Sequence, residues 1–147
     1  FKYYLKGVLS MEKKKVLVPL DGTDRSMHSI DWLKKLFEKE EIKVTLMNVA
    51  EIVIANDMVI SNDTVTRAQK ESEDILDTAL KKLEGYEVDK YCAFGYAADE
   101  ILRKAKQEES DIIIMTKSTK KGIARMIGSV TTKVVKNAKT LVIISPE

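Results

Sequence analysis

The sequence predicts an α/β protein built on an open, doubly wound, five-stranded parallel sheet with helices on both faces. Short apolar segments rich in β-branched residues alternate with longer stretches whose apolar residues recur at helical spacing. The segments 111–115 and 140–145 are apolar throughout, as expected of parallel strands that are covered on both faces. Because crossovers between parallel strands are right-handed, helices between such strands cover both faces of the sheet.

The expected strands are the segments 15–20, 43–49, 88–94, 111–115 and 140–145. The first helix, between the first two strands, has Ser26 as its candidate cap and an apolar face made by Met27, Ile30, Leu33 and Phe37. The second helix ends at Gly85, and its face is made by Ala68, Ser72, Ile75, Ala79 and Leu83. The third helix has an apolar face made by Ala98, Ile101, Leu102 and Ala105. The fourth has one made by Val130, Val134 and Val135.

Length and charge limit the classes of function. The 147 residues are enough for one domain, which we place at residues 11–147, with residues 1–10 before Met11 as an N-terminal extension outside the fold. A net charge of +2 gives no general attraction to nucleic acid or to an anionic membrane surface. No apolar run approaches the ~20 residues that cross a bilayer. The single cysteine, Cys92, is typical of a protein of the reducing cytoplasm.

Ligands of doubly wound sheets bind beyond the carboxyl ends of the strands, where the strand order reverses. Three strand ends are candidates for such a site: Pro19–Gly22, Val49 and Met115–Thr116. They would line one crevice if the first, second and fourth strands are neighbours. Asp21 would then accept hydrogen bonds from a ribose hydroxyl or a base amino group, or it would instead cap the turn into the first helix.

The dipeptide Gly128-Ser129 opens the fourth helix. Free amide groups and the positive end of the helix dipole make such a position an anion site, with the Ser129 hydroxyl as a further donor. The alternative is that Ser129 only caps its helix. Four cations lie in the segment just before it: Lys117, Lys120, Lys121 and Arg125. They would offset the charge of a polyphosphate, or they form a solvated basic loop.

The sequence gives no positive support for catalysis. His28, the single histidine, has no serine or cysteine partner at a recognisable spacing, and no metal-ligand cluster emerges. A phosphoreceiver domain would need an acceptor Asp at the end of the third strand, which reads CAFGYAADE and has none at its tip. The remaining catalytic alternative is slow nucleotide hydrolysis by bound Mg²⁺ and water, with Asp21 as the candidate acid–base group.

Four passages together resemble the universal stress protein family over residues 14–147: KVLVPLDGTDRS, VTLMNV, GYAADEILRKAKQEESDIIIMT and GSVTTKVVKNAKTLVIIS. The resemblance implies a sheet of strand order 3-2-1-4-5 in a cytoplasmic protein induced by stress. It also implies a homodimer that pairs through the last strand, here Leu141, Val142, Ile143 and Ile144. Some members of the family bind ATP or AMP, with Mg²⁺ as an expected companion, and others bind no nucleotide.

The resemblance also assigns candidate nucleotide contacts. The nucleotide-binding subgroup has Gly-x-x-Gly, nine residues, and then Gly-Ser or Gly-Thr. In this chain the two early glycines fall on Thr116 and Thr119, and only the eight residues 120–127 separate Thr119 from the Gly-Ser pair. The adenosine contacts fall on Pro19, Leu20, Asp21, Val49 and Met115, and the phosphate contacts on Gly128, Ser129 and Val130.

The main question is whether a nucleotide can still bind when threonine replaces these glycines. If either position needed a left-handed backbone, a β-branched residue there would cost about 1–3 kcal/mol. Since about 1.4 kcal/mol is tenfold in affinity, two such penalties would move a micromolar ligand toward millimolar. We therefore expect weak or altered binding of ATP or AMP. The alternative is an interaction module of the same fold whose crevice holds no nucleotide.

Overall fold

The computed structural model describes residues 12–51, 61–117 and 128–146. The elements follow one another in the order β1 (Lys14–Leu20), α2 (Asp24–Leu36), β2 (Ile42–Ala50), α3 (Asn62–Lys81), β3 (Glu87–Phe94), α4 (Ala97–Glu108), β4 (Ile112–Thr116), α5 (Ser129–Asn137) and β5 (Leu141–Ser145). The strands form one parallel sheet of order β3-β2-β1-β4-β5. The predicted fold class and strand order are confirmed, whereas residues 1–10 lie outside the described part.

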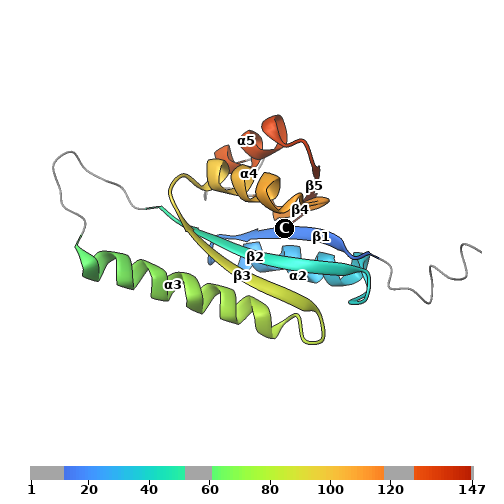
Figure 1. Cartoon of the computed structure of the whole chain (residues 1–147), viewed down its shortest axis with the longest axis horizontal. Helices are drawn as coiled ribbons and strands as arrows, with labels where there is room; N and C mark the ends of the chain where they lie inside the picture. The colour runs from blue at the N-terminus through green and yellow to red at the C-terminus, as the bar shows by residue number, and fades with distance from the viewer. Residues whose placement is uncertain (1–11, 52–60, 118–127, 147) are drawn as a thin grey trace, which may run out of the picture.

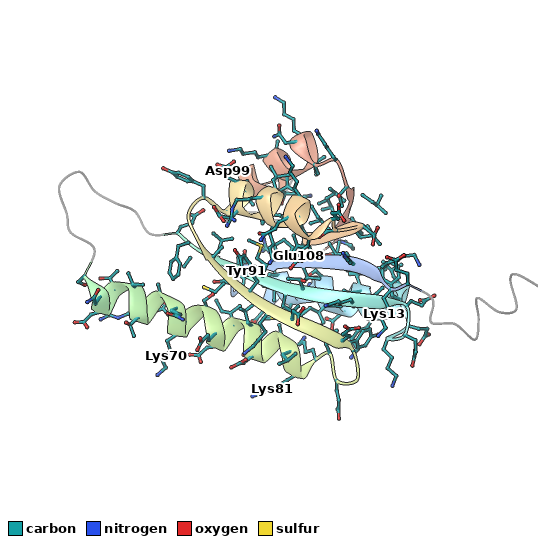
Figure 2. The ribbon with its side chains drawn as sticks, viewed as in Figure 1. Lys13, Lys70, Lys81, Tyr91, Asp99 and Glu108 are labelled. Carbon is teal, nitrogen blue, oxygen red and sulfur yellow. The ribbon has the colours of Figure 1, made fainter. Side chains whose placement is uncertain are left out.

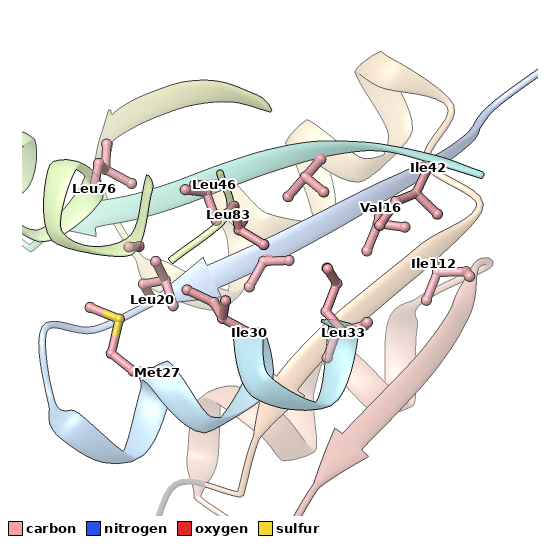
Figure 3. Packing of buried hydrophobic residues seen from close by; sticks show 14 residues of the cluster. Val16, Leu20, Met27, Ile30, Leu33, Ile42, Leu46, Leu76, Leu83 and Ile112 are labelled. Carbon is pink, nitrogen blue, oxygen red and sulfur yellow. The ribbon is translucent and has the colours of Figure 1, made fainter. Parts of the chain in front are cut away.

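Helices cover both faces of the sheet, with α2 and α3 on one side and α4 and α5 on the other (Figure 1). Successive residues of a strand point to opposite faces, so each buried strand supplies both layers. Ile112 and Ile114 of β4 pack in the layer under α2 and α3, which Figure 3 shows from close by. Ile113 and Met115 pack in the layer under α4 and α5. The all-apolar pattern of this strand is therefore a consequence of its burial on two sides.

The helix caps differ in part from the sequence prediction. Thr23, not Ser26, caps α2: the Thr23 Oγ1 atom accepts a hydrogen bond of 3.2 Å from the Ser26 backbone N–H. Ser26 itself lies buried in the first turn of the helix. The prediction failed because Thr, Asp and Ser are all good capping residues and follow one another here. The helix α3 has Ser61 as its cap and ends at Lys81, before Gly85.

Two predicted helix faces also need correction. In α5 the buried positions are Thr131 and Val134, whereas the Val135 side chain is 51% exposed. In α3 the sequence analysis left out Leu76, which is 2% exposed and belongs to the core. Both corrections concern apolar residues that are adjacent in the sequence: Val134 with Val135, and Ile75 with Leu76. For such a pair, the helical period alone does not determine which residue faces the sheet.

Several polar side chains join α4 to β2 and β3, in the layer of the core that lies under α4 and α5. The Lys104 Nζ atom lies 2.8 Å from the Glu108 Oε1 atom and 3.8 Å from the centroid of the Tyr91 ring. The other Glu108 oxygen accepts a 2.9 Å hydrogen bond from the hydroxyl of Thr45 on β2. Figure 2 shows Tyr91 and Glu108 at this contact between β3 and α4. The buried Lys104 ammonium thus has a partner, as burial of a charge in a protein interior requires.

The sheet opens between β1 and β4 toward its carboxyl end. β1 pairs with β2 along its whole length, but it pairs with β4 at Val16–Ile112 and Leu17–Ile113. Pro19 lies within the central strand β1, opposite Met47 of β2. Its missing N–H is tolerated because β4 has already separated from β1 at this level. This separation leaves room for a ligand.

Candidate functional site

A cavity of about 550 Å³ lies at the carboxyl end of the sheet, a size typical of small-molecule sites. It is bounded by the ends of β1, β2 and β4 and by the first turns of α2, α4 and α5. Its lining residues are Pro19, Leu20, Asp21, Thr23, Arg25, Ser26, Met47, Val49, Ala97, Ile101, Met115, Thr116, Lys117, Val130 and Thr131. The three strand ends named from the sequence therefore do line one crevice.

The structure brings together most residues of the predicted nucleotide site. Those that line the cavity are Pro19, Leu20, Asp21, Val49, Met115, Thr116 and Val130. Gly128 and Ser129 lie at the start of α5 next to Val130, but they are not among the lining residues. Thr119 lies outside the described residues, as do Lys120, Lys121 and Arg125.

Asp21 is held by the turn between β1 and α2. Its Oδ1 atom accepts hydrogen bonds of 3.0 Å from the Thr23 N–H and 2.6 Å from the Thr23 hydroxyl. Gly22 gives the turn its left-handed backbone, with φ of 84°. Both contacts use Oδ1, so the second carboxylate oxygen remains for a ligand. The turn role and the ligand role of Asp21 are therefore compatible in geometry.

A buried polar junction supports the β1 side of the cavity. The Asn48 Nδ2 atom donates a 2.8 Å hydrogen bond to the Leu20 carbonyl, and the Asn48 Oδ1 atom accepts a 2.7 Å bond from the Ser72 hydroxyl. Asn48 and Ser72 are both buried, so the junction links α3 and β2 to the last residue of β1. Asn48 was not among the site residues predicted from the sequence. Its signal was an amide side chain within an otherwise apolar strand.

Thr116 does not have the strain that its sequence position suggested. It belongs to β4, and Glu109 is the one non-glycine residue with positive φ in the described chain. The Thr116 Oγ1 atom accepts a 3.2 Å hydrogen bond from the Ser145 hydroxyl and lies 3.5 Å from the Ser26 carbonyl. These contacts hold the side chain on the α2 face of the sheet. The expected left-handed penalty therefore does not apply at Thr116.

The start of α5 leaves several hydrogen-bond donors available. Gly128 is the N-cap, so Ser129 is the first helical residue and the interpretation of Ser129 as the cap is wrong. The first helical hydrogen bond runs from the Thr132 N–H to the Gly128 carbonyl. The amides of Ser129, Val130 and Thr131 therefore have no partner within the helix. Thr131, which the sequence analysis did not select, is fully buried and lines the cavity.

The charged side chains along the cavity include two cations, Arg25 and Lys117, and one carboxylate, Asp21. The amides at the start of α5 favour an anionic ligand. Across residues 12–51, 61–117 and 128–146 no three His, Cys, Asp or Glu side chains are grouped to hold a metal ion. None of the helices in these stretches has the length and apolar character needed to cross a bilayer.

A model of the universal stress protein family matches residues 13–146. The chain belongs to the universal stress protein family. One member, the universal stress protein MJ0531 of Methanocaldococcus jannaschii, is 29% identical over 142 residues, which cover 89% of this chain and 81% of the relative. The resemblance drawn from the four sequence passages is confirmed.

Solved structures share the fold. Hypothetical protein MJ0577 has a TM-score of 0.78 at 24% identity, with 93% of this chain and 98% of the other covered. A universal stress protein in complex with cAMP has a TM-score of 0.66 at 19% identity, with 92% and 98% covered. An Arabidopsis thaliana family member with AMP bound has a TM-score of 0.68 at 17% identity, with 91% and 92% covered.

Proposed function

We propose that this universal stress protein is a cytoplasmic, homodimeric stress-response protein whose crevice binds an adenine nucleotide. The observation that carries the nucleotide proposal is that one cavity gathers seven of the ten predicted contacts, which lie on β1, the turn after it, β2, β4 and α5. Structures of family members with cAMP or AMP support the choice of an adenine nucleotide. The residues proposed to contact the nucleotide are Pro19, Leu20, Asp21, Val49, Met115, Thr116, Thr119, Gly128, Ser129 and Val130.

We favour AMP over ATP as the nucleotide. Structures of family members in complex with AMP and dAMP support this choice. ATP would bring more negative charge, and Mg²⁺ usually binds proteins through one or two carboxylates together with the phosphates of the substrate. Asp21 is the lining residue able to play that part. Mg²⁺ would therefore accompany ATP, whereas AMP would bind without it.

Equilibrium dialysis with labelled AMP and ATP, each with and without Mg²⁺, tests this proposal. We expect retention of AMP that does not depend on Mg²⁺ and that falls when Asp21 is replaced by alanine. Asp89, an exposed carboxylate on β3 away from the cavity, gives the matched control Asp89→Ala, which should bind as the wild type does. No retention of either nucleotide at millimolar concentration would exclude the nucleotide function.

The homodimer is proposed to form through β5, at the edge of the described sheet. Leu141 is 60% exposed, while Val142, Ile143 and Ile144 are half-buried. An open strand edge with apolar side chains is a template for pairing with another strand. The same surface supports the second candidate function, an interaction module of this fold whose partner at β5 is a different protein.

Sedimentation analysis distinguishes these two functions. We expect a dimer for the wild type and a monomer for Leu141→Lys, because a charge in place of the most exposed apolar side chain of β5 opposes pairing. Phe94→Lys is the matched control: Phe94 is 41% exposed on β3, the opposite edge strand, and its replacement should leave the dimer intact. A wild-type protein that is monomeric at high concentration would contradict the homodimer and favour the interaction module.

A further inference from the structure

We propose that the groove between α2 and α3 is a docking site for a basic, extended segment of a partner protein, which places an apolar side chain on the floor of the groove and cationic side chains against its acidic rim. The groove has a volume of about 490 Å³ and lies on the face of the sheet that these two helices cover (Figure 1). This inference goes beyond the proposed nucleotide function and does not depend on it.

Two helix faces form the sides of the groove. On α2 the lining residues include Asp24, Met27 and Asp31, which are spaced at i, i+3 and i+7. On α3 they include Asp74 and Thr78, which are spaced at i and i+4. Residues at these spacings lie on one side of a helix, so each helix lines the gap with a row of side chains. Asp24 and Asp31 are roughly 10 Å apart along the helix axis, which is the length of about three extended residues. The groove therefore fits a short stretch of extended chain.

The floor of the groove is apolar. Met27, which Figure 3 shows near the start of α2, is 8% exposed and belongs to the core. Ile75 of α3 is half-buried and packs against the same core. A Cβ atom at Gly22 would lie 2.8 Å from the Ile75 Cδ1 atom, so Ile75 packs directly on the turn that precedes α2. An apolar side chain of a partner would gain stability by burial against Met27 and Ile75.

The rim of the groove is acidic, although the whole chain has a net charge of +2. Three aspartates and one lysine line the groove, together with His28. The lysine, Lys82, has its Nζ atom 3.8 Å from the Asp31 Oδ1 atom. Asp24 and Asp74 have no ion pair within the described part of the chain. Lysine or arginine side chains of a partner are the complementary groups for these two carboxylates.

The same charges disfavour other occupants of the groove. A nucleic acid or an anionic lipid surface would bring phosphate groups toward carboxylates, which repel them. A second copy that docked through the same groove in a two-fold pair would bring identical aspartates together, because such an interface is self-complementary. A basic segment of a different protein is the occupant that suits both the floor and the rim.

The binding test uses the full-length protein and a fluorescein-labelled probe peptide of sequence Lys-Lys-Leu-Lys-Lys-Leu-Lys. Two analogues have glutamate in place of each lysine or serine in place of each leucine. We expect fluorescence anisotropy to show binding of the probe that weakens as the salt concentration rises, weaker binding of the serine analogue, and no binding of the glutamate analogue. In NMR spectra the methyl signals of Met27 and Ile75 should shift as the probe is added.

Substitutions along the rim test the location of the site. Asp24→Asn combined with Asp74→Asn removes the two carboxylates that have no ion pair. An exposed ion pair corresponds to roughly 1.5- to 5-fold in affinity, so this double variant should bind the probe about 2- to 25-fold more weakly. The matched control, Glu73→Gln combined with Glu84→Gln, changes the net charge equally at exposed positions outside the groove and should bind as the wild type does. Thr78→Arg places a long cationic side chain in the groove and should abolish binding, while the high helix propensity of arginine keeps α3 folded.

Four outcomes would overturn the inference. The first is the absence of any anisotropy change with the probe at millimolar protein. The second is binding that the Asp24→Asn, Asp74→Asn double variant and Thr78→Arg leave unchanged, or that leaves the Met27 and Ile75 methyl signals unmoved, since the probe would then occupy another surface. The third is equal binding of the serine analogue, which would refute the apolar contact. The fourth is a lower oligomeric state of Thr78→Arg in sedimentation, which would make the occupant a second copy. Dialysis with AMP tests the nucleotide function separately from all four.

Discussion

Replacing Thr116 with glycine restores the residue that the nucleotide-binding motif of the family has at the end of the fourth strand. If threonine there blocked the crevice or strained the backbone, Thr116→Gly would improve nucleotide binding. The structure predicts a different result. Thr116 has an extended backbone in β4, and its hydroxyl contacts Ser145 and Ser26 on the α2 face of the sheet.

Three losses give the magnitude of the effect on stability. The Thr116 side chain, in a residue that is 8% exposed, contributes about 0.8 kcal/mol through its buried methyl group. Glycine within a strand costs roughly 0.5–1 kcal/mol in backbone entropy. The Ser145 hydroxyl, 2% exposed, would lose its acceptor, which costs about 1–3 kcal/mol. We therefore expect Thr116→Gly to lower the free energy of unfolding by about 2–5 kcal/mol.

Urea unfolding measures this change, and calorimetry with AMP measures affinity in the same preparations. Thr116→Ser is the matched control, because it retains the hydroxyl and should lose only about 1 kcal/mol. We expect AMP affinity to stay within about threefold of the wild type, a difference of less than 1 kcal/mol. A gain of tenfold or more in Thr116→Gly would refute this reasoning, since it would mean that the threonine obstructs the ligand.

Three further substitutions test the framework of the fold. Asn48→Ala removes both buried hydrogen bonds of this side chain, and urea unfolding should show a loss of about 2–3 kcal/mol. Gly22→Ala places a Cβ atom 2.8 Å from the Ile75 Cδ1 atom at a positive φ, so its unfolding free energy should fall by about 1–3 kcal/mol, and Ile75→Val should restore part of this loss. Burial raises the pKa of Tyr86 above its ordinary value of about 10, so the stability that this raised pKa contributes is present below pH 10 and lost at higher pH. Tyr86→Phe should therefore lose about 1 kcal/mol at neutral pH with its bond to a backbone carbonyl, and its stability relative to the wild type should rise in unfolding experiments above pH 10.

The sequence was a good guide to the strands and a weaker guide to the helices. Strands buried on two faces leave a continuous apolar signal, and all five expected segments overlap the observed strands. A helix leaves a signal only at every third or fourth residue, so Leu76 was left out and Val135 was placed on the buried face. The cap of α2 was assigned to Ser26 instead of Thr23 because capping depends on backbone geometry that neighbouring polar residues share.

For the candidate site, the sequence predicted which strand ends line the cavity. It did not predict the orientations and hydrogen bonds of the side chains there. The ends of β1, β2 and β4 could be placed because parallel strands finish at one edge of the sheet. The orientation of Thr116 could not, since it depends on Ser145 at the end of another strand. The role of Asn48 likewise follows from its burial and from its two hydrogen bonds. These are properties of the packed molecule, and residue spacing does not encode them.

The early separation of β1 from β4 has an evolutionary consequence. Because β1 and β4 separate after Leu17 and Ile113, the paths of the two strands contribute to the hollow together with the side chains that line it. Substitutions along its wall can therefore alter which molecule is accepted while the scaffold keeps its shape. Proteins with this sheet can therefore gain, exchange or lose a ligand through a few point substitutions, while every intermediate sequence still folds.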